Sequence, residues 1–337
     1  MKAIVYEGSK SISVKEIPIP EVEPGWALIK VAYAGICGTD LNIYNGTHPR
    51  AKAPLVMGHE FSGTLVHDTP HLKAGTRVTV YPLLSCGECP SCLSGNAHVC
   101  NTLKLLGIDR DGGMAEFVQA PIDTIIPIRD DVSDSLGALI EPIAVGVHTL
   151  RETTFVPGDN SIVFGCGTIG LTIAITLQQF GASSVTMVET DPERMAIARN
   201  LGFQVIDPTK ESVEDHTKHI TGGNGFDWVF DCAGVQAVAD KLFDTVRVKG
   251  HIVIVAGYKY PASLPLMKGM FKETSIQFVR VYRKKDFEIA AELVSKDPRY
   301  NQVVTHTLNC EKAVEGFELL TTKGSGAIKV LFSFTDK

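Results

Sequence analysis

Residues 160–170 read NSIVFGCGTIG, and this stretch decides the fold of the middle of the chain. It joins an apolar strand, a glycine-rich turn and the start of a helix that runs to Gly181. Further strands and helices alternate after it with short loops, as in SSVTMVE followed by DPERMAIARNLG, and then in FDWVFD and HIVIVAG. Such alternation is typical of a parallel sheet covered by helices on both faces. We therefore predict an α/β domain built on a doubly wound parallel sheet.

The glycine-rich turn follows the pattern G-x-G-x-x-G with Gly165, Gly167 and Gly170. The first glycine permits the tight turn, the second lets a pyrophosphate approach the backbone, and the third allows close packing of helix on strand. Thr168 and Ile169 open the helix, whose N-terminus attracts phosphate groups. The turn therefore predicts a dinucleotide site, and an ordinary tight turn is the alternative interpretation.

An acidic residue, Glu189, ends the next strand of the sequence. Its carboxylate is suited to accept hydrogen bonds from ribose hydroxyls and to repel a 2′-phosphate, which favours NAD over NADP. Arg194 lies just beyond Glu189 in the following helix. We expect it either beside the adenine or on a solvated helix face.

Four cysteines lie in the run CGECPSCLSGNAHVC with the spacing C-x2-C-x2-C-x7-C. Four thiolates on one short loop suit a tetrahedral Zn²⁺ site. Because four protein ligands leave no open position for a substrate, this site is expected to be structural. Its ligands are Cys86, Cys89, Cys92 and Cys100.

A second set of metal ligands is spread along the chain, with Cys37 in AGICGTD, His59 and Glu60 in MGHEFSG, and Glu141 in LIEPIAVGVHT. A thiolate, an imidazole and carboxylates suit a catalytic zinc, which keeps one position open for water or substrate. Each residue alone has an ordinary structural interpretation. Their occurrence beside the four-cysteine run favours the metal site, so two zinc ions per chain are expected.

The composition limits the other classes of function. The chain has 337 residues, a hydrophobic content of 44% and a net charge of −6, which fits two globular domains and argues against nucleic acid or an anionic membrane as a partner. No apolar run approaches the length of a membrane span, and the N-terminus lacks the features of a signal peptide. We therefore expect a cytoplasmic protein, where clustered cysteines bind metal rather than form disulfides.

The pattern of predicted elements at the two ends of the chain differs from that in its middle. Short strands broken by Gly and Pro fill the first part, and strands return after about residue 275. We predict a discontinuous, β-rich, zinc-containing catalytic domain of residues 1–146 and 275–337. The dinucleotide-binding domain is predicted at residues 147–274.

Taken together, these motifs resemble those of the zinc-dependent medium-chain alcohol dehydrogenase family, over nearly the whole chain. Residues 141–142, Glu-Pro, resemble its polyol branch, which includes sorbitol, threonine, butanediol and galactitol-phosphate dehydrogenases. The motifs that carry the resemblance are CGTD at 37–40, GHE at 58–60, the cysteine run at 86–100, DGGMAEF at 111–117 and PGDNSIVFGCGTIG at 157–170.

The resemblance implies a GroES-like catalytic domain and a Rossmann coenzyme domain. It implies a catalytic zinc held by Cys37, His59 and Glu60, with Glu141 bound directly or through water. The implied reaction is oxidation of a secondary alcohol, a polyol or a sugar derivative, to a ketone with hydride transfer to NAD. Threonine, a small diol or a sugar phosphate are the alternative substrates. A homodimer or homotetramer is implied, joined through edge strands of the coenzyme domain, for which residues 251–258 are the candidate.

Two features of the sequence differ from the usual family pattern. Asn42 stands where the family often has a proton-relaying histidine, so the hydroxyl of Thr39 is expected to take the proton, unless it is a plain loop residue. The basic stretch RVYRKK at 280–285 is either a solvated helix start or a contact for a carboxylate or phosphate.

Two other classes of protein compete with the enzyme as interpretations of the chain. A non-catalytic zinc ribbon that binds nucleic acid or a protein partner is disfavoured by the acidic net charge and by the lack of basic and aromatic residues around the four cysteines. A zinc-free quinone reductase of the same superfamily is disfavoured because it has no need of the cysteine run.

Overall fold

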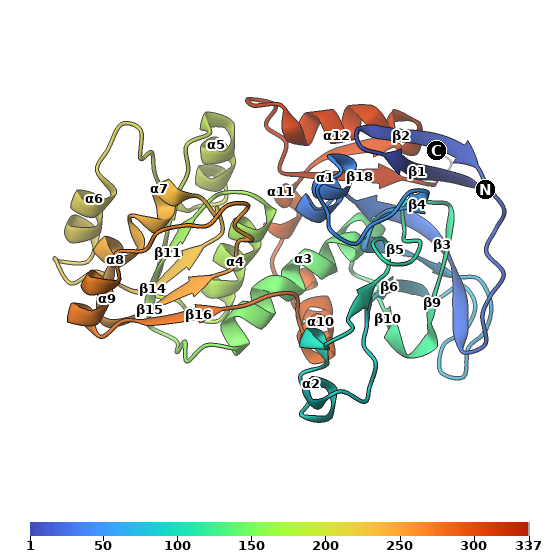
Figure 1. The fold of residues 1–337 in the computed structure, drawn as a ribbon, viewed down its shortest axis with the longest axis horizontal. Coiled ribbons are helices and arrows are strands. Elements are labelled where there is room, and N and C mark those ends of the chain that lie inside the picture. The colour runs from blue at the N-terminus through green and yellow to red at the C-terminus, as the bar shows by residue number, and fades with distance from the viewer. Residues whose placement is uncertain (336–337) are drawn as a thin grey trace. The chain divides into compact units, whose positions relative to one another are not determined.

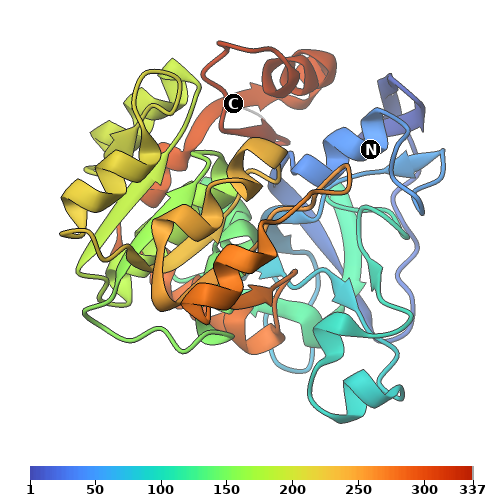
Figure 2. The same cartoon turned by 60° about the vertical axis from the view of Figure 1, so that its left-hand side comes forward.

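The computed structural model describes residues 1–335 and divides into two compact units (Figures 1 and 2). One unit is continuous and spans Val145–Tyr282. The other joins Met1–Ala144 with the chain from Arg283 onward. Across the described residues, no helix combines the length and the apolarity that a bilayer span requires.

The continuous unit is built on six parallel strands in the order β13-β12-β11-β14-β15-β16, with helices on both faces (Figure 1). This arrangement confirms the predicted doubly wound α/β fold. The central strands are rich in apolar residues because both faces of the sheet are covered, and Phe164, Phe226 and Ile252 are buried in the core. The strands are β11 (Asn160–Phe164), β12 (Ser184–Val188), β13 (Gln204–Ile206), β14 (Phe226–Asp231), β15 (Val246–Ile254) and β16 (Ser275–Phe278). The helices are α4 (Thr168–Gln179), α5 (Pro192–Asn200), α6 (Val213–Ile220), α7 (Gln236–Ala239), α8 (Leu242–Thr245) and α9 (Leu266–Lys272).

The structure corrects two sequence-based expectations at the edge of this sheet. The sequence places residues 275–278 in the catalytic domain, but they form β16, which pairs with β15 in the parallel sheet. Residues 251–258 are expected nearest the edge, but β15 lies between β14 and β16. Both errors have the same physical reason. The four-residue strand β16 follows α9 and extends the strand–helix alternation of the parallel sheet by one more strand.

The discontinuous unit is mainly antiparallel sheet. Its largest sheet follows the path β10-β6-β5-β3-β18-β17, and β9 also pairs with β3. The members are β3 (Trp26–Gly35), β5 (Glu60–Leu65), β6 (Arg77–Val80), β9 (Phe117–Pro121), β10 (Ile125–Pro127), β17 (Val304–Asn309) and β18 (Lys329–Ser333). Smaller sheets join β1 (Lys2–Gly8), β2 (Ser11–Glu16) and β4 (Leu55–Val56), and also β7 (Leu83–Leu84) and β8 (Lys104–Leu105).

The C-terminal strands complete this unit. Strand β18 pairs antiparallel with β3, so the red C-terminal segment lies beside the blue N-terminal strands in Figure 1. The helices of the unit are α1 (Gly38–Tyr44), α2 (Pro90–Leu93), α10 (Lys284–Leu293), α11 (Tyr300–Val303) and α12 (Ala313–Thr321), with short 3-10 turns at Ala97–Val99, Ile122–Thr124, Val294–Lys296 and Cys310–Lys312. Helix α3 (Asp134–Arg151) begins here and ends in the other unit.

Candidate active site and zinc sites

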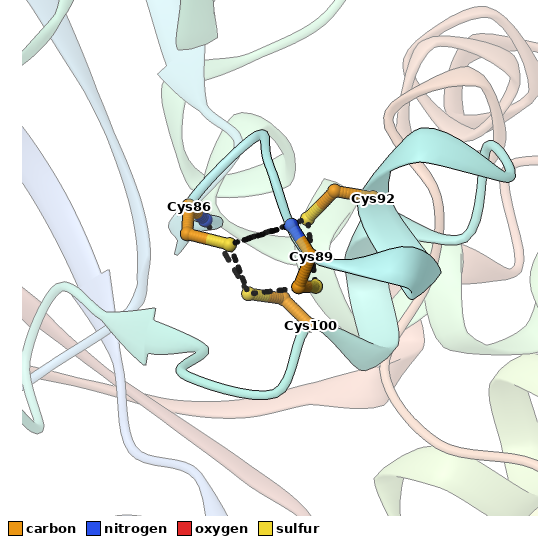
Figure 3. A group of neighbouring side chains, drawn as sticks. All are labelled: Cys86, Cys89, Cys92 and Cys100. Carbon is orange, nitrogen blue, oxygen red and sulfur yellow. Dashed lines mark hydrogen bonds between the residues drawn. The ribbon is translucent and has the colours of Figure 1, made fainter.

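The four cysteines of the CGECPSCLSGNAHVC run converge on one point (Figure 3). Their sulfur atoms all lie within 4.8 Å of one another. The separations along the ring are 3.9 Å for Cys86–Cys92, 3.5 Å for Cys92–Cys89, 3.9 Å for Cys89–Cys100 and 3.5 Å for Cys100–Cys86. Sulfur atoms bound tetrahedrally at about 2.3 Å from one Zn²⁺ lie about 3.8 Å apart. The cysteine lobe, residues 86–100, therefore fits a zinc ion without rearrangement.

Backbone hydrogen bonds favour the thiolate form of Cys100. Cys89 precedes α2, and Pro90 fixes the first position of that helix. The backbone N–H groups of Cys86 and Thr102 donate to the sulfur of Cys100 at 3.3 and 3.4 Å, and they lower the pKa of Cys100 to about 6. A thiol with this pKa is a thiolate near neutral pH, which is the form that binds zinc.

The basic stretch at 280–285 lies beside the cysteine lobe. The guanidinium of Arg283 donates to the side chain of Asn96 in the lobe at 2.8 Å, and Lys284 donates to the carbonyl of Asp123. Lys285 pairs with Glu288, one turn along α10. The first two contacts hold the start of α10 against the lobe and the turn after β9, so these side chains have protein partners.

A second group of ligand atoms comes from Cys37, His59 and Glu60, which also lie within 4.8 Å of one another. Cys37 precedes the first turn of α1, while His59 and Glu60 stand at the start of β5. His59 and Glu60 are only 3% and 1% exposed, whereas Cys37 is partly exposed. The group thus combines two buried donors with one that is partly exposed, which is compatible with an open metal site.

Asp40 supports this group from the opposite side of the imidazole. It is fully buried, and its carboxylate accepts the backbone N–H of Cys37 at 2.8 Å. Its other oxygen lies 4.0 Å from Nδ1 of His59, and neither atom has a hydrogen-bond partner among residues 1–335. A carboxylate facing the second nitrogen is the usual partner of a metal-binding histidine. Sequence reasoning missed Asp40, although it stands in the CGTD motif.

The electrostatics of the group favour a bound cation. Burial lowers the pKa of His59, but the negative charges of Cys37, Asp40 and Glu141 outweigh burial and hold that pKa well above its usual range. Burial also raises the pKa of Asp40. This excess of negative charge around a buried imidazole is the environment that a dication neutralises. On donor chemistry and charge, the residues present fit a catalytic zinc.

The most important site residue that the sequence motifs miss is Lys329 on β18. Its ammonium donates to both carboxylate oxygens of Glu60, at 2.8 and 2.6 Å, and to the carbonyl of Ile36 at 2.8 Å. Although burial lowers a lysine pKa, the carboxylate of Glu60 raises the pKa of Lys329 above its usual value, so the ammonium stays charged. The signal was present as one lysine inside the apolar strand IKVLFSF.

Gly35 makes this ion pair possible. It lies directly opposite Glu60 across β3 and β5, and a Cβ atom there would come within 2.3 Å of the Glu60 carboxylate. Any other residue at position 35 would push the carboxylate away from Lys329. Gly35, the first glycine of AGICGTD, is therefore a steric requirement of the site.

The other predicted site residues lie around the group without joining it. Thr39 is half-buried in the first turn of α1, and Asn42 lies one turn later. Glu141 is buried on α3 and contributes to the raised pKa values of His59 and Lys329, but it is not part of the three-residue cluster.

In the continuous unit, each glycine of the turn has the geometry that its predicted role requires. Gly165 has a φ of +102°, which favours glycine. A Cβ added at Gly167 would have as its nearest neighbour a guanidinium nitrogen of Arg194, 3.9 Å away, so the backbone is open to a ligand. At Gly170 a Cβ would meet the carbonyl oxygen of Gly165 at 1.8 Å. Helix α4 therefore starts close against the turn.

Glu189 is tied to this turn. One carboxylate oxygen accepts the backbone N–H of Cys166 at 2.8 Å, and the other accepts the N–H groups of Thr190 and Asp191 at 2.7 and 3.0 Å. Asp191 in turn caps α5 by accepting from Arg194, which places Arg194 beside the turn. Glu189 and Arg194 therefore both border the predicted coenzyme site.

Comparison with known proteins places this geometry in a family. The family models described as "Alcohol dehydrogenase GroES-like domain" and "Zinc-binding dehydrogenase" match residues 23–130 and 168–296. L-threonine 3-dehydrogenase of Mesorhizobium japonicum is 31% identical over 97% of this chain and 98% of its own length. The chain belongs to the zinc-dependent medium-chain alcohol dehydrogenase family. This family couples oxidation of an alcohol to reduction of NAD(P), so the chain is an enzyme and the zinc-ribbon hypothesis was wrong.

Other members of the family are similar over most of their length. The 2-dehydro-3-deoxy-L-galactonate 5-dehydrogenase of Pseudoalteromonas atlantica is 32% identical over 88% of this chain and 87% of its own. The crystal structure of 2R,3R-butanediol dehydrogenase from Bacillus subtilis matches with a TM-score of 0.92 and 30% identity, covering 99% of each chain. This likeness confirms the GroES-like and Rossmann fold classes of the dehydrogenase.

Removing one thiol of the cysteine lobe tests its structural role. We expect Cys89→Ser to lose one of two zinc ions and to lower the melting temperature by roughly 5 °C or more, because a lost metal ligand costs several kcal/mol. Zinc content and calorimetry are the measurements. The control is Cys310→Ala, which lies outside both clusters and should retain both ions. Full stability after loss of the lobe zinc would contradict the structural role.

Breaking the buried ion pair tests the dependence of the site on Lys329. We expect Lys329→Met to destabilise the dehydrogenase by about 3–5 kcal/mol, because it leaves Glu60 buried without a counter-charge. The double variant Lys329→Met with Glu60→Gln should recover most of this loss. Denaturant unfolding of the four members of this cycle gives the coupling free energy, and additive losses would show that the two side chains act independently.

Neutralising Glu189 tests the basis of coenzyme choice. We expect Glu189→Gln, which keeps the hydrogen-bond acceptor, to raise the NADP⁺-to-NAD⁺ ratio of kcat/KM roughly ten-fold or more, since like charges a few ångströms apart repel by about 1–4 kcal/mol. The control is Glu193→Gln, on the exposed start of α5. An unchanged ratio in Glu189→Gln would rule out a charge-based choice at this position.

Proposed function

We propose that this dehydrogenase oxidises a polyol or sugar-derived secondary alcohol to a ketone, with NAD as the hydride acceptor. The observation that carries the proposal is the cluster of Cys37, His59 and Glu60, with one donor partly exposed and two donors buried. The discontinuous unit is proposed to hold the alcohol, and the unit Val145–Tyr282 to hold the coenzyme.

Each residue of the cluster has a proposed task. Zinc held by Cys37, His59 and Glu60 would supply a Lewis acid that lowers the pKa of an alcohol hydroxyl by several units. Asp40 orients the imidazole of His59, and Lys329 balances the charge of Glu60. Both oxygens of Glu60 accept from Lys329, so Glu60 would share them between the ammonium and the zinc. Glu141 adds negative charge from α3.

The proton of the alcohol is proposed to leave through Thr39. This hydroxyl lies two residues after Cys37 in the first turn of α1, and a hydroxyl can accept one proton while it donates another. Asn42 has no titratable group, so it takes no part in proton transfer.

The coenzyme is proposed to bind at the glycine turn. Gly165 and Gly167 would leave the backbone open to a pyrophosphate, and the N–H groups of Thr168 and Ile169 at the start of α4 would donate to its oxygens. Gly170 keeps the helix close to the turn. The carboxylate of Glu189 would exchange its backbone partners for ribose hydroxyls, which supports NAD over NADP.

The relatives support an alcohol with a second oxygen. Threonine, butanediol and a deoxygalactonate each carry the oxidised hydroxyl near another oxygen-bearing carbon. Because these relatives act on different alcohols, a polyol, a β-hydroxy amino acid and a small diol are all candidate substrates to be tested.

An alcohol panel tests the function. We expect NAD⁺ reduction with at least one of sorbitol, 2,3-butanediol, L-threonine and galactitol 1-phosphate. Cys37→Ser should lose one zinc ion and at least roughly a thousand-fold in kcat, the scale of several kcal/mol of lost Lewis-acid stabilisation. The matched control is Cys310→Ala. A Cys37→Ser variant that keeps both zinc ions and full turnover would contradict the proposed ligand set.

We further propose that two copies of the chain associate through the edge of the parallel sheet. Strand β16 ends the sheet, and an uncovered edge strand pairs readily with a second one. Large apolar side chains of β16 itself, of α9 and of the loop before α9 are exposed, Phe278 of β16 by 73% and Phe271 of α9 by 76%. Such a patch marks an interface, and a second copy supplies both the matching edge and the matching apolar surface. The other members are Tyr260, Leu266, Met267 and Met270.

Charges placed in this patch test the assembly. We expect the wild-type chain to be a homodimer or homotetramer. The double variant Phe271→Asp with Phe278→Asp should raise the Kd of the β16 interface by at least roughly a hundred-fold, because two apolar anchors are lost. Light scattering after size exclusion is the measurement. Val314→Asp, on exposed α12, is the control. A monomeric wild type would refute the interface.

The cysteine lobe also bears on where the dehydrogenase works. We propose the cytoplasm, because a reducing compartment keeps four neighbouring cysteines as thiolates for zinc.

A further inference from the structure

The discontinuous unit contains a groove that the proposed mechanism does not use. Its volume is about 840 Å³, which lies within the range of sites that bind small molecules. Within residues 1–335, its lining includes none of the proposed catalytic residues. This Arg50 groove is lined by Met1, Trp26 and residues of the segments 17–21, 50–56, 104–112 and 115–119.

The groove reaches the end of β3 that is far from the zinc ligands. Trp26 begins β3 and lines the groove, whereas Gly35 ends the strand opposite Glu60. Because a strand advances by about 3.3 Å per residue, Trp26 and Gly35 stand roughly 30 Å apart. The Arg50 groove therefore extends away from the Cys37 group and is a separate feature of the unit.

The buried side chains of the groove lining are all apolar, and none of them is more than 6% exposed. They are Leu55, Val56, Ile108, Ala115 and Val118. A ligand that covers these side chains removes apolar surface from water, which favours a molecule with a hydrocarbon part.

Positive charge collects around Arg50. Its guanidinium donates to the carbonyl of Leu103 at 2.7 Å and pairs with Asp109 at 3.2 Å. These two contacts fix Arg50 beside Lys104, the residue that follows Leu103. Lys52 stands two residues after Arg50, and both lysines are exposed members of the lining. Three cations therefore border one part of the groove.

The two lysines have no counter-charge. Neither Lys52 nor Lys104 forms an ion pair or a side-chain hydrogen bond in the part of the chain that the structure describes. Asp109 neutralises Arg50 and also accepts the backbone N–H of Leu105 at 2.9 Å. Asp109 therefore leaves the charges of both lysines uncompensated.

The two remaining acidic residues of the lining are Glu21 and Asp111. Asp111 accepts the backbone N–H of Val56 at 2.9 Å, and Glu21 is exposed on the loop after β2. Since neither acid pairs with Lys52 or Lys104, the two ammonium groups stay available to an anion.

Trp26 provides an aromatic wall of the groove. The guanidinium of Arg110 lies 4.4 Å from the centre of its indole ring, and this cation pairs with Glu23. The backbone N–H of Glu23 in turn donates to the side chain of Gln119 at 3.0 Å. These contacts hold the indole in one position, so its environment reports what enters the groove.

We propose that the Arg50 groove binds a small organic carboxylate with an apolar chain. The carboxylate would pair with Lys52 and Lys104, and the chain would face the buried apolar side chains. Two ammonium groups without a counter-charge attract an anion. The apolar surface next to them favours a carboxylate with a hydrocarbon chain over an inorganic anion. This binding does not depend on which alcohol the enzyme oxidises.

Fluorine NMR tests the position of the ligand. The chain has two tryptophans, Trp26 in the groove and Trp228 in β14 of the other unit, so 5-fluorotryptophan gives two signals. The variant Trp228→Phe assigns them. We expect hexanoate to shift the Trp26 signal of the zinc-loaded enzyme with a Kd in the millimolar range, the scale for a ligand of this size. The Trp228 signal should not move, and hexylamine and inorganic phosphate should shift neither signal.

Removing the two ammonium groups tests the role of charge. We expect Lys52→Ala with Lys104→Ala to raise the Kd of hexanoate roughly five- to twenty-fold, because two surface ion pairs are lost. The matched control is Lys30→Ala with Lys323→Ala, two exposed lysines outside the groove, which should keep the Kd within about two-fold. Isothermal titration calorimetry gives the Kd, and the melting temperature shows that the variants are folded.

No saturable shift of the Trp26 signal at millimolar hexanoate would overturn the inference, and so would an equal response to hexylamine. Equal losses in the two double variants would show attraction by the overall charge of the protein and not by this groove. Binding that survives the groove substitutions but disappears in Cys37→Ser would place hexanoate on the catalytic zinc instead. None of these readouts needs turnover, so they are independent of the test of the proposed function.

Discussion

The ion pair between Lys329 and Glu60 is the constraint on which the catalytic unit depends. Both side chains are almost fully buried, and an uncompensated charge at that depth costs several kcal/mol. The pair can form only if β18 lies against β3, and only if position 35 lacks a Cβ atom. One electrostatic requirement therefore fixes the pairing of a C-terminal strand and the identity of a glycine far from it in sequence.

The two metal clusters differ in where their donor atoms come from and in what surrounds them. In the cysteine lobe, all four donors come from one short loop, and the sulfur spacing fits a saturated tetrahedral ion. In the second cluster the donors come from α1 and β5, and their surroundings supply orientation through Asp40 and charge through Lys329. The first cluster stabilises a loop that has little apolar core. The second combines a partly exposed thiol with two buried donors, and Asp40 and Lys329 lie against those donors.

Local patterns in the sequence were sufficient for the parts of the structure that are local. The glycine turn at 165–170 and the cysteine spacing each lie within one short segment, so both were predicted correctly as structure. Lys329 was missed because its partner is 269 residues away and no local rule links the two. The boundary at β16 was missed because a four-residue strand resembles the strands on either side of it.

The split course of the catalytic unit has a consequence for how the chain is made. The coenzyme unit, Val145–Tyr282, is contiguous, so it can fold as soon as it leaves the ribosome. The strands of the other unit emerge first but must wait for β18, the last strand of the sheet, which brings the counter-charge for Glu60. The first unit in sequence is therefore completed only by the last strand of the chain, whereas the contiguous unit needs no later segment.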